Sequence, residues 1–137
     1  MNAYIDSSVL LRVILGEPER LSSWDRIDLA VSSDLIRLEC LRTIDRARIH
    51  LRLTDDAVSR QRADILEAIE SINLIPLTTS ILERAAEPFP TLIGTLDAVH
   101  LASALLVRDQ YDDLLFATHD QKLAVAARAI GFHVDGD

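Results

Sequence analysis

Hydrophobic and polar positions along the chain form two kinds of segment that alternate. Short apolar runs bounded by polar residues predict buried strands, and they occupy residues 3–5, 29–32, 74–77, 114–117 and 132–134. Longer segments with apolar positions at helical spacing predict helices, and they cover residues 9–15, about 35–50, 56–71, 80–87, about 96–108 and 121–130. Strands therefore alternate with helices along most of the chain.

Polar residues and prolines mark the ends of these segments. Ser7 or Ser8 is expected to cap the first helix, because a hydroxyl oxygen can accept a hydrogen bond from a free backbone N–H group. The caps expected for later helices are Ser33 or Asp34, Thr54 or Asp55, and Thr95. Pro76 places the strand at 74–77 at an end or edge of its sheet, because proline has no N–H group to donate.

Strands that alternate with helices imply right-handed crossovers and a parallel sheet covered on both faces. No repeat, low-complexity tract or long linker interrupts the chain, so residues 1–137 are predicted to form a single α/β domain. In sheets of this kind the functional crevice lies at the carboxyl ends of the strands. Residues that directly follow the strands are therefore candidates for a site.

Composition adds limits on location and partners. Hydrophobic residues make up 49% of the 137, no apolar stretch is long enough to cross a bilayer, and the N-terminus lacks the pattern of a secretory signal. The single cysteine, Cys40, lies in an apolar helical pattern and is expected to be a buried hydrophobe. These features predict a cytoplasmic protein without a membrane partner. A net charge of −8 argues against nucleic-acid binding through bulk positive charge.

Four carboxylates interrupt or end apolar stretches, and they are the strongest chemical signal in the chain. They are Asp6, Glu39, Asp97 and Asp120. Asp6 and Asp120 follow predicted strands and should share one rim of the sheet. Grouped, partly buried carboxylates repel one another, and a divalent cation would relieve that repulsion.

Each acid also has an ordinary explanation. Asp6 and Asp97 lie where an acid favours a helix N-terminus, and Asp120 is a natural N-cap. Glu39 is in mid-helix and could form a surface salt bridge with Arg42. Taken together, these explanations require four separate coincidences at one rim, which favours a shared site.

The oxygen ligands point to Mg²⁺ or Mn²⁺, which can activate a water and stabilise charge on a phosphodiester. The four histidines and one cysteine have no zinc spacing, and neither a glycine-rich phosphate loop nor a Gly-x-Ser-x-Gly elbow occurs. These absences argue against zinc, nucleotide-binding and serine-hydrolase sites.

Hydroxyl and guanidinium groups flank the acids. Ser7 and Thr118 are predicted to orient a carboxylate or hold a water, whereas Ser8 is expected mainly to cap a helix. Arg42 and Arg46 lie three and seven residues after Glu39, so one helical face is predicted to guide a phosphate backbone towards the acids. The alternative is a solvated face in which these arginines pair with Asp45 and nearby acids.

Four blocks of the sequence resemble the acidic blocks of PIN domains, most closely those of VapC-type ribonuclease toxins. They are Tyr-Ile-Asp-Ser-Ser-Val-Leu at 4–10, Ser-Ser-Asp-Leu-Ile-Arg-Leu-Glu at 32–39, Leu-Asp-Ala-Val-His-Leu-Ala at 96–102 and Ala-Thr-His-Asp-Gln-Lys-Leu-Ala at 117–124. Any one block is a weak signal, but four in order are fairly specific. The resemblance extends from residue 3 to about residue 134.

The resemblance implies a three-layer α/β/α sandwich with a central, mostly parallel sheet of about five short strands. It also implies a Mg²⁺- or Mn²⁺-dependent endoribonuclease that hydrolyses RNA without a covalent enzyme intermediate. Asp6, Glu39, Asp97 and Asp120 match the family's acidic quartet, as both catalytic groups and metal ligands, and Thr118 matches its hydroxyl neighbour. The implied partners are RNA, a cognate antitoxin protein and a second copy of the chain.

Three other functions stay open at this point. A phosphatase with Asp6 as nucleophile would need a second acid two residues later, where Ser8 stands. A noncatalytic PIN-like module that binds RNA or protein would have no need of four costly acids. A metal-dependent DNA nuclease would use the same residues, and only the family resemblance favours RNA.

Overall fold

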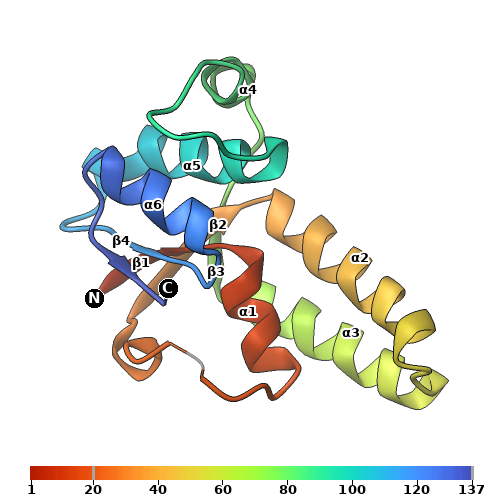
Figure 1. Cartoon of the computed structure of the whole chain (residues 1–137). Coiled ribbons are helices and arrows are strands. Elements are labelled where there is room, and N and C mark those ends of the chain that lie inside the picture. Colours follow the sequence, from red (N-terminus) through yellow and green to blue (C-terminus); the bar gives the residue numbers. More distant parts are fainter. Residues whose placement is uncertain (20, 137) are drawn as a thin grey trace.

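The computed structural model describes residues 1–19 and 21–136, which form one sheet flanked by helices (Figure 1). The strands are β1 (Asn2–Ile5), β2 (Leu29–Ser33), β3 (Ile72–Ile75), β4 (Leu115–Ala117) and β5 (Val134–Asp135). The α-helices are α1 (Ser7–Ile14), α2 (Leu35–His50), α3 (Asp55–Glu70), α4 (Thr79–Ala85), α5 (Thr95–Val107) and α6 (Gln121–Ala129). Short 3₁₀ helices occupy Trp24–Arg26 and Arg108–Gln110.

All neighbouring strands pair in parallel, in the order β3-β2-β1-β4-β5. The chain starts at the centre of the sheet, builds one half through β2 and β3, and then crosses β1 to build the other half. Consecutive strands are joined by segments that contain helices, as parallel pairing requires. The predicted α/β fold with five short parallel strands is confirmed.

Alternating side chains of the central strand β1 separate two cores, one on each face of the sheet. Tyr4 packs with residues of α4, α5 and α6, including Ile81, Leu101 and Leu123. Ala3 and Ile5 point the other way and pack with residues of α1, α2 and α3. Figure 1 shows this division, with α4, α5 and α6 on one side and α1, α2 and α3 on the other. The result is the three-layer sandwich that the sequence predicts.

β3 begins earlier than predicted, and β5 begins later. β3 covers residues 72–75 instead of 74–77, because Pro76 cannot continue the ladder and Leu77 is exposed. β3 is also an edge strand, as Pro76 predicts. β5 covers residues 134–135 instead of 132–134, because Phe132 is buried in the core, with its ring 5.5 Å from that of Phe116.

Two predicted caps are also wrong. The N-cap of α1 is Asp6 itself, whose side chain accepts a hydrogen bond from the Val9 N–H group, and not Ser7 or Ser8. The N-cap of α5 is Gly94, without a side-chain hydrogen bond, so Thr95 lies inside the helix. Thr54 does cap α3, as expected, and its hydroxyl accepts from the Ala57 N–H group.

Parallel pairing brings the carboxyl ends of β1 and β4 to one edge of the sheet. Asp6 directly follows β1, and Asp120 follows β4 after two further residues. Glu39 lies in the second turn of α2, which starts just after β2, and Asp97 lies in the first turn of α5. In the part of the chain that the structure describes, no helix is long and apolar enough to span a membrane.

Candidate active site

Asp6 is the most deeply buried of the four acids, with 4% of its surface exposed. Its Oδ1 atom accepts hydrogen bonds from the Ser8 hydroxyl at 2.5 Å and the Val9 N–H group at 3.3 Å. Its Oδ2 atom accepts from the Thr118 hydroxyl at 2.6 Å. Burial raises the pKa of Asp6, and the hydrogen bonds from Ser8 and Thr118 oppose that rise. Both oxygens are thus fixed in direction.

The Thr118 hydroxyl joins two of the acids. It donates to Asp6 and accepts a hydrogen bond from the Asp120 N–H group at 3.0 Å. Asp120 in turn caps α6, because its Oδ1 atom accepts from the Leu123 N–H group at 3.1 Å. Asp120 is therefore a helix cap, as its ordinary explanation requires, and at the same time a close neighbour of Asp6.

Asp97 lies within electrostatic range of the other three carboxylates. Its pKa is raised from 3.8 to about 6, first by burial and then by the negative charges of Asp120, Asp6 and Glu39, against an opposing effect of His100. Such an effect requires the other three acids to lie near Asp97. Among the described residues, no lysine or arginine forms an ion pair with any of the four acids.

Glu39 is held by a buried histidine. His100, in the second turn of α5, contacts Glu39 Oε1 through its Nε2 atom, and its Nδ1 atom lies 2.7 Å from the Tyr4 hydroxyl. Tyr4 and His100 are almost fully buried, while the side chain of Glu39 is 15% exposed. Glu39 Oε1 is thus engaged by His100, whereas Oε2 makes no hydrogen bond with the residues that the structure describes.

These acids offer the donor chemistry of a hard divalent ion. Within the described ranges, no three His, Cys, Asp or Glu side chains already converge closely enough to hold a metal ion by themselves. Mg²⁺ characteristically keeps several of its waters and is held through one or two carboxylates, so it does not need three converging side chains. Oxygen ligands without a paired cation fit a hydrated Mg²⁺ or Mn²⁺ ion.

The structure differs from the sequence-based site in its supporting groups. Ser8, expected mainly to cap a helix, donates to Asp6 and also accepts from the His119 N–H group at 2.9 Å. Ser7, predicted to orient a carboxylate, makes no side-chain hydrogen bond with the residues that the structure describes, so the hydrogen bond to Asp6 belongs to its neighbour. Tyr4 and His100 were not predicted, although His100 lies one helical turn after Asp97.

The arginines of α2 lie on its exposed side. Arg42 forms an ion pair with Asp45 at 3.1 Å, which is the alternative considered from the sequence. Arg46 donates to the Thr43 hydroxyl at 3.3 Å. A shallow groove of about 410 Å³ runs between α2 and α3, and it is lined by Asp34, Arg37, Leu38, Leu41, Arg42, Asp45 and Arg62. The groove carries three guanidinium groups and two carboxylates.

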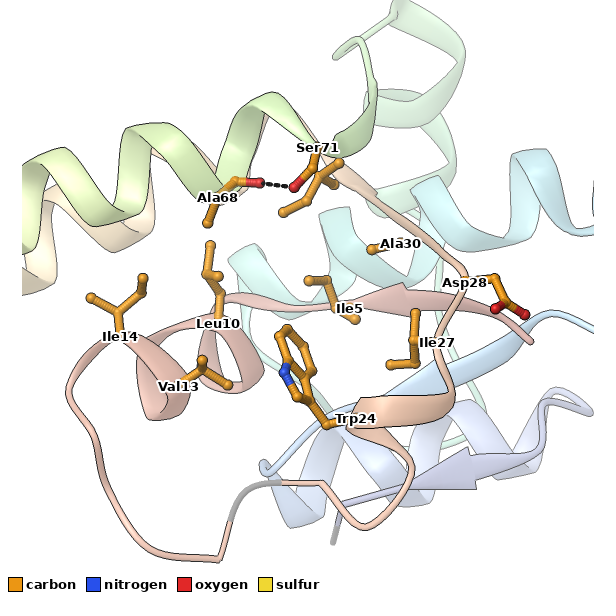
Figure 2. A pocket seen from close by; sticks show the side chains of 11 residues that line it. Ile5, Leu10, Val13, Ile14, Trp24, Ile27, Asp28, Ala30, Ala68 and Ser71 are labelled. Atoms are coloured by element: carbon orange, nitrogen blue, oxygen red, sulfur yellow. Dashed lines mark hydrogen bonds between the residues drawn. The ribbon is translucent and has the colours of Figure 1, made fainter.

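A separate apolar hollow of about 310 Å³ lies on the α1 side of the sheet (Figure 2). Figure 2 shows Leu10 and Ile14 of α1 extending towards α3, with the ring of Trp24 between α1 and the sheet. None of the four acids lines this hollow. The hollow is therefore a separate, largely apolar feature partly lined by α1, and it is not part of the acidic space.

Comparison with known proteins agrees with this geometry. The model of the PIN domain family matches residues 3–129. The chain belongs to the PIN domain family. Ribonuclease VapC46 of Mycobacterium tuberculosis (strain ATCC 25618 / H37Rv) is 30% identical over 134 residues, which cover 96% of this chain and 94% of that protein. Ribonuclease VapC47 of M. tuberculosis (strain CDC 1551 / Oshkosh) is 28% identical over 136 residues, 94% of this chain and 92% of that protein.

Solved structures share this PIN-domain fold. A toxin–antitoxin complex from Klebsiella pneumoniae superposes with a TM-score of 0.61 at 18% identity, over 93% of this chain and 94% of that chain. VapBC2 from Rickettsia felis, bound to a DNA fragment from its promoter, superposes with a TM-score of 0.68 at 10% identity, over 98% of this chain and 97% of that chain. At these identities the likeness confirms the fold alone.

Replacing Asp97 with asparagine is expected to stabilise the metal-free protein at pH 7.5. The folded-state pKa of about 6 lies above the ordinary 3.8, so the charged form is unfavourable in the folded state and Asp97→Asn removes that penalty. The full elevation corresponds to about 3 kcal/mol, but solvent screening at this partly exposed site reduces the gain to on the order of 1 kcal/mol. Urea unfolding measures it.

The gain should decline as the pH falls below about 6 and vanish below about pH 3, where Asp97 is protonated in both the folded and the unfolded state. Asp112→Asn, which removes one charge from an exposed loop, is the matched control and should change the free energy of unfolding by less than about 0.5 kcal/mol. Loss of stability in Asp97→Asn at pH 7.5 would show that the acids are not crowded.

Proposed function

We propose that this protein is a metal-dependent endoribonuclease that acts as the toxin of a toxin–antitoxin pair. The observation that carries the proposal is the gathering of carboxylates at the carboxyl edge of the sheet. The Thr118 hydroxyl joins Asp6 and Asp120 there, and the charges of Asp120, Asp6 and Glu39 contribute to the raised pKa of Asp97. Membership of the PIN domain family and the names of the M. tuberculosis relatives, which are ribonucleases, support the same activity. The proposed place of action is the cytoplasm.

Asp6, Glu39, Asp97 and Asp120 are the proposed catalytic residues and the proposed metal ligands. When bound, Mg²⁺ or Mn²⁺ would lower the pKa of a water and neutralise charge on the scissile phosphate. Ser8 and Thr118 direct the two oxygens of Asp6, so this carboxylate would hold the ion in a fixed orientation. Ser7, at the first position of α1, is proposed as a further hydroxyl at the rim. Hydrolysis proceeds without a covalent enzyme intermediate.

The proposed partners follow from charge and shape. Four acids without an ion-paired lysine or arginine in the described part of the chain should attract a basic side chain of an antitoxin, which would displace the metal or exclude RNA. The apolar hollow beside α1 offers a second contact for such a partner (Figure 2). Both structural neighbours described above come from toxin–antitoxin systems, and we extend the antitoxin and a homodimeric state to this chain as proposals.

Cleavage of RNA by the purified protein tests the activity. With Mg²⁺ or Mn²⁺ we expect discrete fragments from total cellular RNA, and with EDTA we expect none. Asp6→Asn and Asp97→Asn should cleave RNA at least on the order of 10²-fold more slowly than the wild type. This is the scale seen when one charge-stabilising group is removed from an active site. A single-stranded DNA of matching sequence shows whether DNA is also cut.

Asp112→Asn is the control for this assay, because it also removes one acid but lies in an exposed loop. The three variants should be compared at equal folded concentration. Metal-independent cleavage, or equal cleavage by Asp97→Asn and Asp112→Asn, would rule out the proposed mechanism. Metal binding without any cleavage would favour the noncatalytic PIN-like module.

We also propose that Arg42 and Arg46 contact the RNA backbone on its way to the acids. Arg46→Glu, placed in the Asp6→Asn background to prevent cleavage, should weaken RNA binding about tenfold, since a hydrogen bond to a charged group contributes about 1.5–3 kcal/mol. The salt dependence of binding should also become less steep. Fluorescence anisotropy with a labelled single-stranded RNA measures both.

Arg60→Glu is the matched control for charge, because Arg60 is exposed on α3 and pairs with Asp56 at 3.2 Å. It makes the same change in net charge without altering the Glu39 helix. If Arg46→Glu and Arg60→Glu bind RNA equally well, α2 does not guide the backbone and its arginines form a solvated face.

A further inference from the structure

A buried chain of hydrogen bonds links three of the elements that carry the acids. Tyr4 belongs to β1, two residues before Asp6, and His100 belongs to α5, three residues after Asp97. His100 contacts Tyr4 on one side and Glu39 of α2 on the other. The hydrogen-bonded series Tyr4–His100–Glu39 therefore connects β1 of the sheet, α5 of one helical layer and α2 of the other.

Glu39 needs such an anchor more than Asp6 and Asp120 do. Asp6 and Asp120 are fixed by the caps they form at the strand ends. Glu39 lies on α2, and Figure 1 shows α2 and α3 running away from the sheet as a pair. A carboxylate on a helix that leaves the sheet would otherwise be free to turn between several side-chain rotamers.

Both ends of the histidine ring are occupied, which fixes its orientation. A carboxylate oxygen can only accept a hydrogen bond, so the ring must carry a hydrogen on Nε2 to donate to Glu39 Oε1. In the neutral ring Nδ1 is then the acceptor, and the Tyr4 hydroxyl donates to it. Rotation of the ring by 180° would break both contacts inside a region from which water is excluded.

Tyr4 is itself held rigidly. Its ring stacks on Phe116 with centroids 5.2 Å apart and meets the edge of His100 at 5.8 Å. A tyrosine hydroxyl carries its hydrogen at neutral pH, so Tyr4 can donate it to His100 Nδ1. A rigid donor at Nδ1 thus selects the tautomer with hydrogen on Nε2.

We propose that His100 is a positioning residue that, with Tyr4 behind it, holds Glu39 Oε1 and directs Oε2 into the acidic space. The role of Glu39 as a metal ligand rests on the proposed function, but the orientation of the side chains does not. Partners of this kind, which hold a ligand without touching the metal, typically change metal affinity by about 10- to 100-fold when removed.

Two substitutions of His100 separate its two contacts. In His100→Gln the amide nitrogen Nε2 stands as many bonds from the backbone as the histidine Nε2, so the donor to Glu39 is kept. In His100→Asn the amide reaches only the Tyr4 end. We expect His100→Asn to weaken Mn²⁺ binding by about 10- to 100-fold, measured by calorimetry on the folded, metal-free protein, and His100→Gln to stay closer to the wild type.

A purely structural histidine would give a different result. Both substitutions would lower the melting temperature, and the folded fractions would bind Mn²⁺ alike. Equal affinity in His100→Gln and His100→Asn would therefore overturn the proposal.

Tyr4→Phe gives a test that leaves the ring of His100 in place. In the metal-free wild type, a long-range ¹H–¹⁵N spectrum should show His100 with a protonated Nε2 and an unprotonated Nδ1, and the peaks are assigned by their absence in His100→Gln. In Tyr4→Phe the Nδ1 signal should move because its donor is gone. Tyr111→Phe, which removes the other tyrosine hydroxyl of the chain, is the control and should leave it unchanged.

The two proposals fail in different ways. A ring with its hydrogen on Nδ1 in the wild type would overturn the positioning role, whatever the RNA assay shows. A protein that shows the expected tautomer and the expected order of Mn²⁺ affinities, but cuts no RNA, would keep the positioning role and contradict the nuclease.

Discussion

Mutual repulsion among four carboxylates is the constraint around which this edge of the sheet is built. Burial and three neighbouring acids raise the pKa of Asp97 to about 6, and no described lysine or arginine pairs with the group. The fold tolerates this repulsion through hydrogen-bond donors: hydroxyls of Ser8 and Thr118 on Asp6, and a histidine on Glu39. Such donors fix the direction of the carboxylate oxygens.

Two of the acids also stabilise the fold, because they are the N-caps of helices. Asp6 and Asp120 cap α1 and α6 while they contribute to the acidic space. Thr118 joins these two caps through one hydroxyl. A helix cap contributes roughly 1 kcal/mol, so the placement of these acids is partly stabilised by the helices that they start. Asp6 and Asp120 therefore have the capping role that their ordinary explanation predicts, and the same contacts hold them where the proposed function needs them.

The fold, and the edge of the sheet that Asp6 and Asp120 share, could be predicted from the sequence because both depend on simple geometry. Alternating elements require a parallel sheet, and parallel strands bring Asp6 and Asp120 to one edge. The contact between Tyr4 and His100 could not be predicted, because it joins residues 96 positions apart and no local sequence pattern records it. Ser7 was favoured over Ser8 as a supporting hydroxyl because both follow the strand, and only the turn of the backbone decides that Ser8 donates to Asp6. The sequence places β3 too late because Leu77 is apolar but exposed.

The pKa of Asp97 in the metal-free protein is the most direct test of the central claim that four carboxylates share one site. A ¹³C NMR titration of the side-chain carboxyl measures it, in the wild type and in Asp120→Asn, since Asp120 is the acid with the largest effect on Asp97. The account predicts a pKa of about 6 in the wild type, a lower value in Asp120→Asn, and a fall on addition of Mg²⁺. A pKa near the ordinary value in both proteins, unchanged by Mg²⁺, would contradict it.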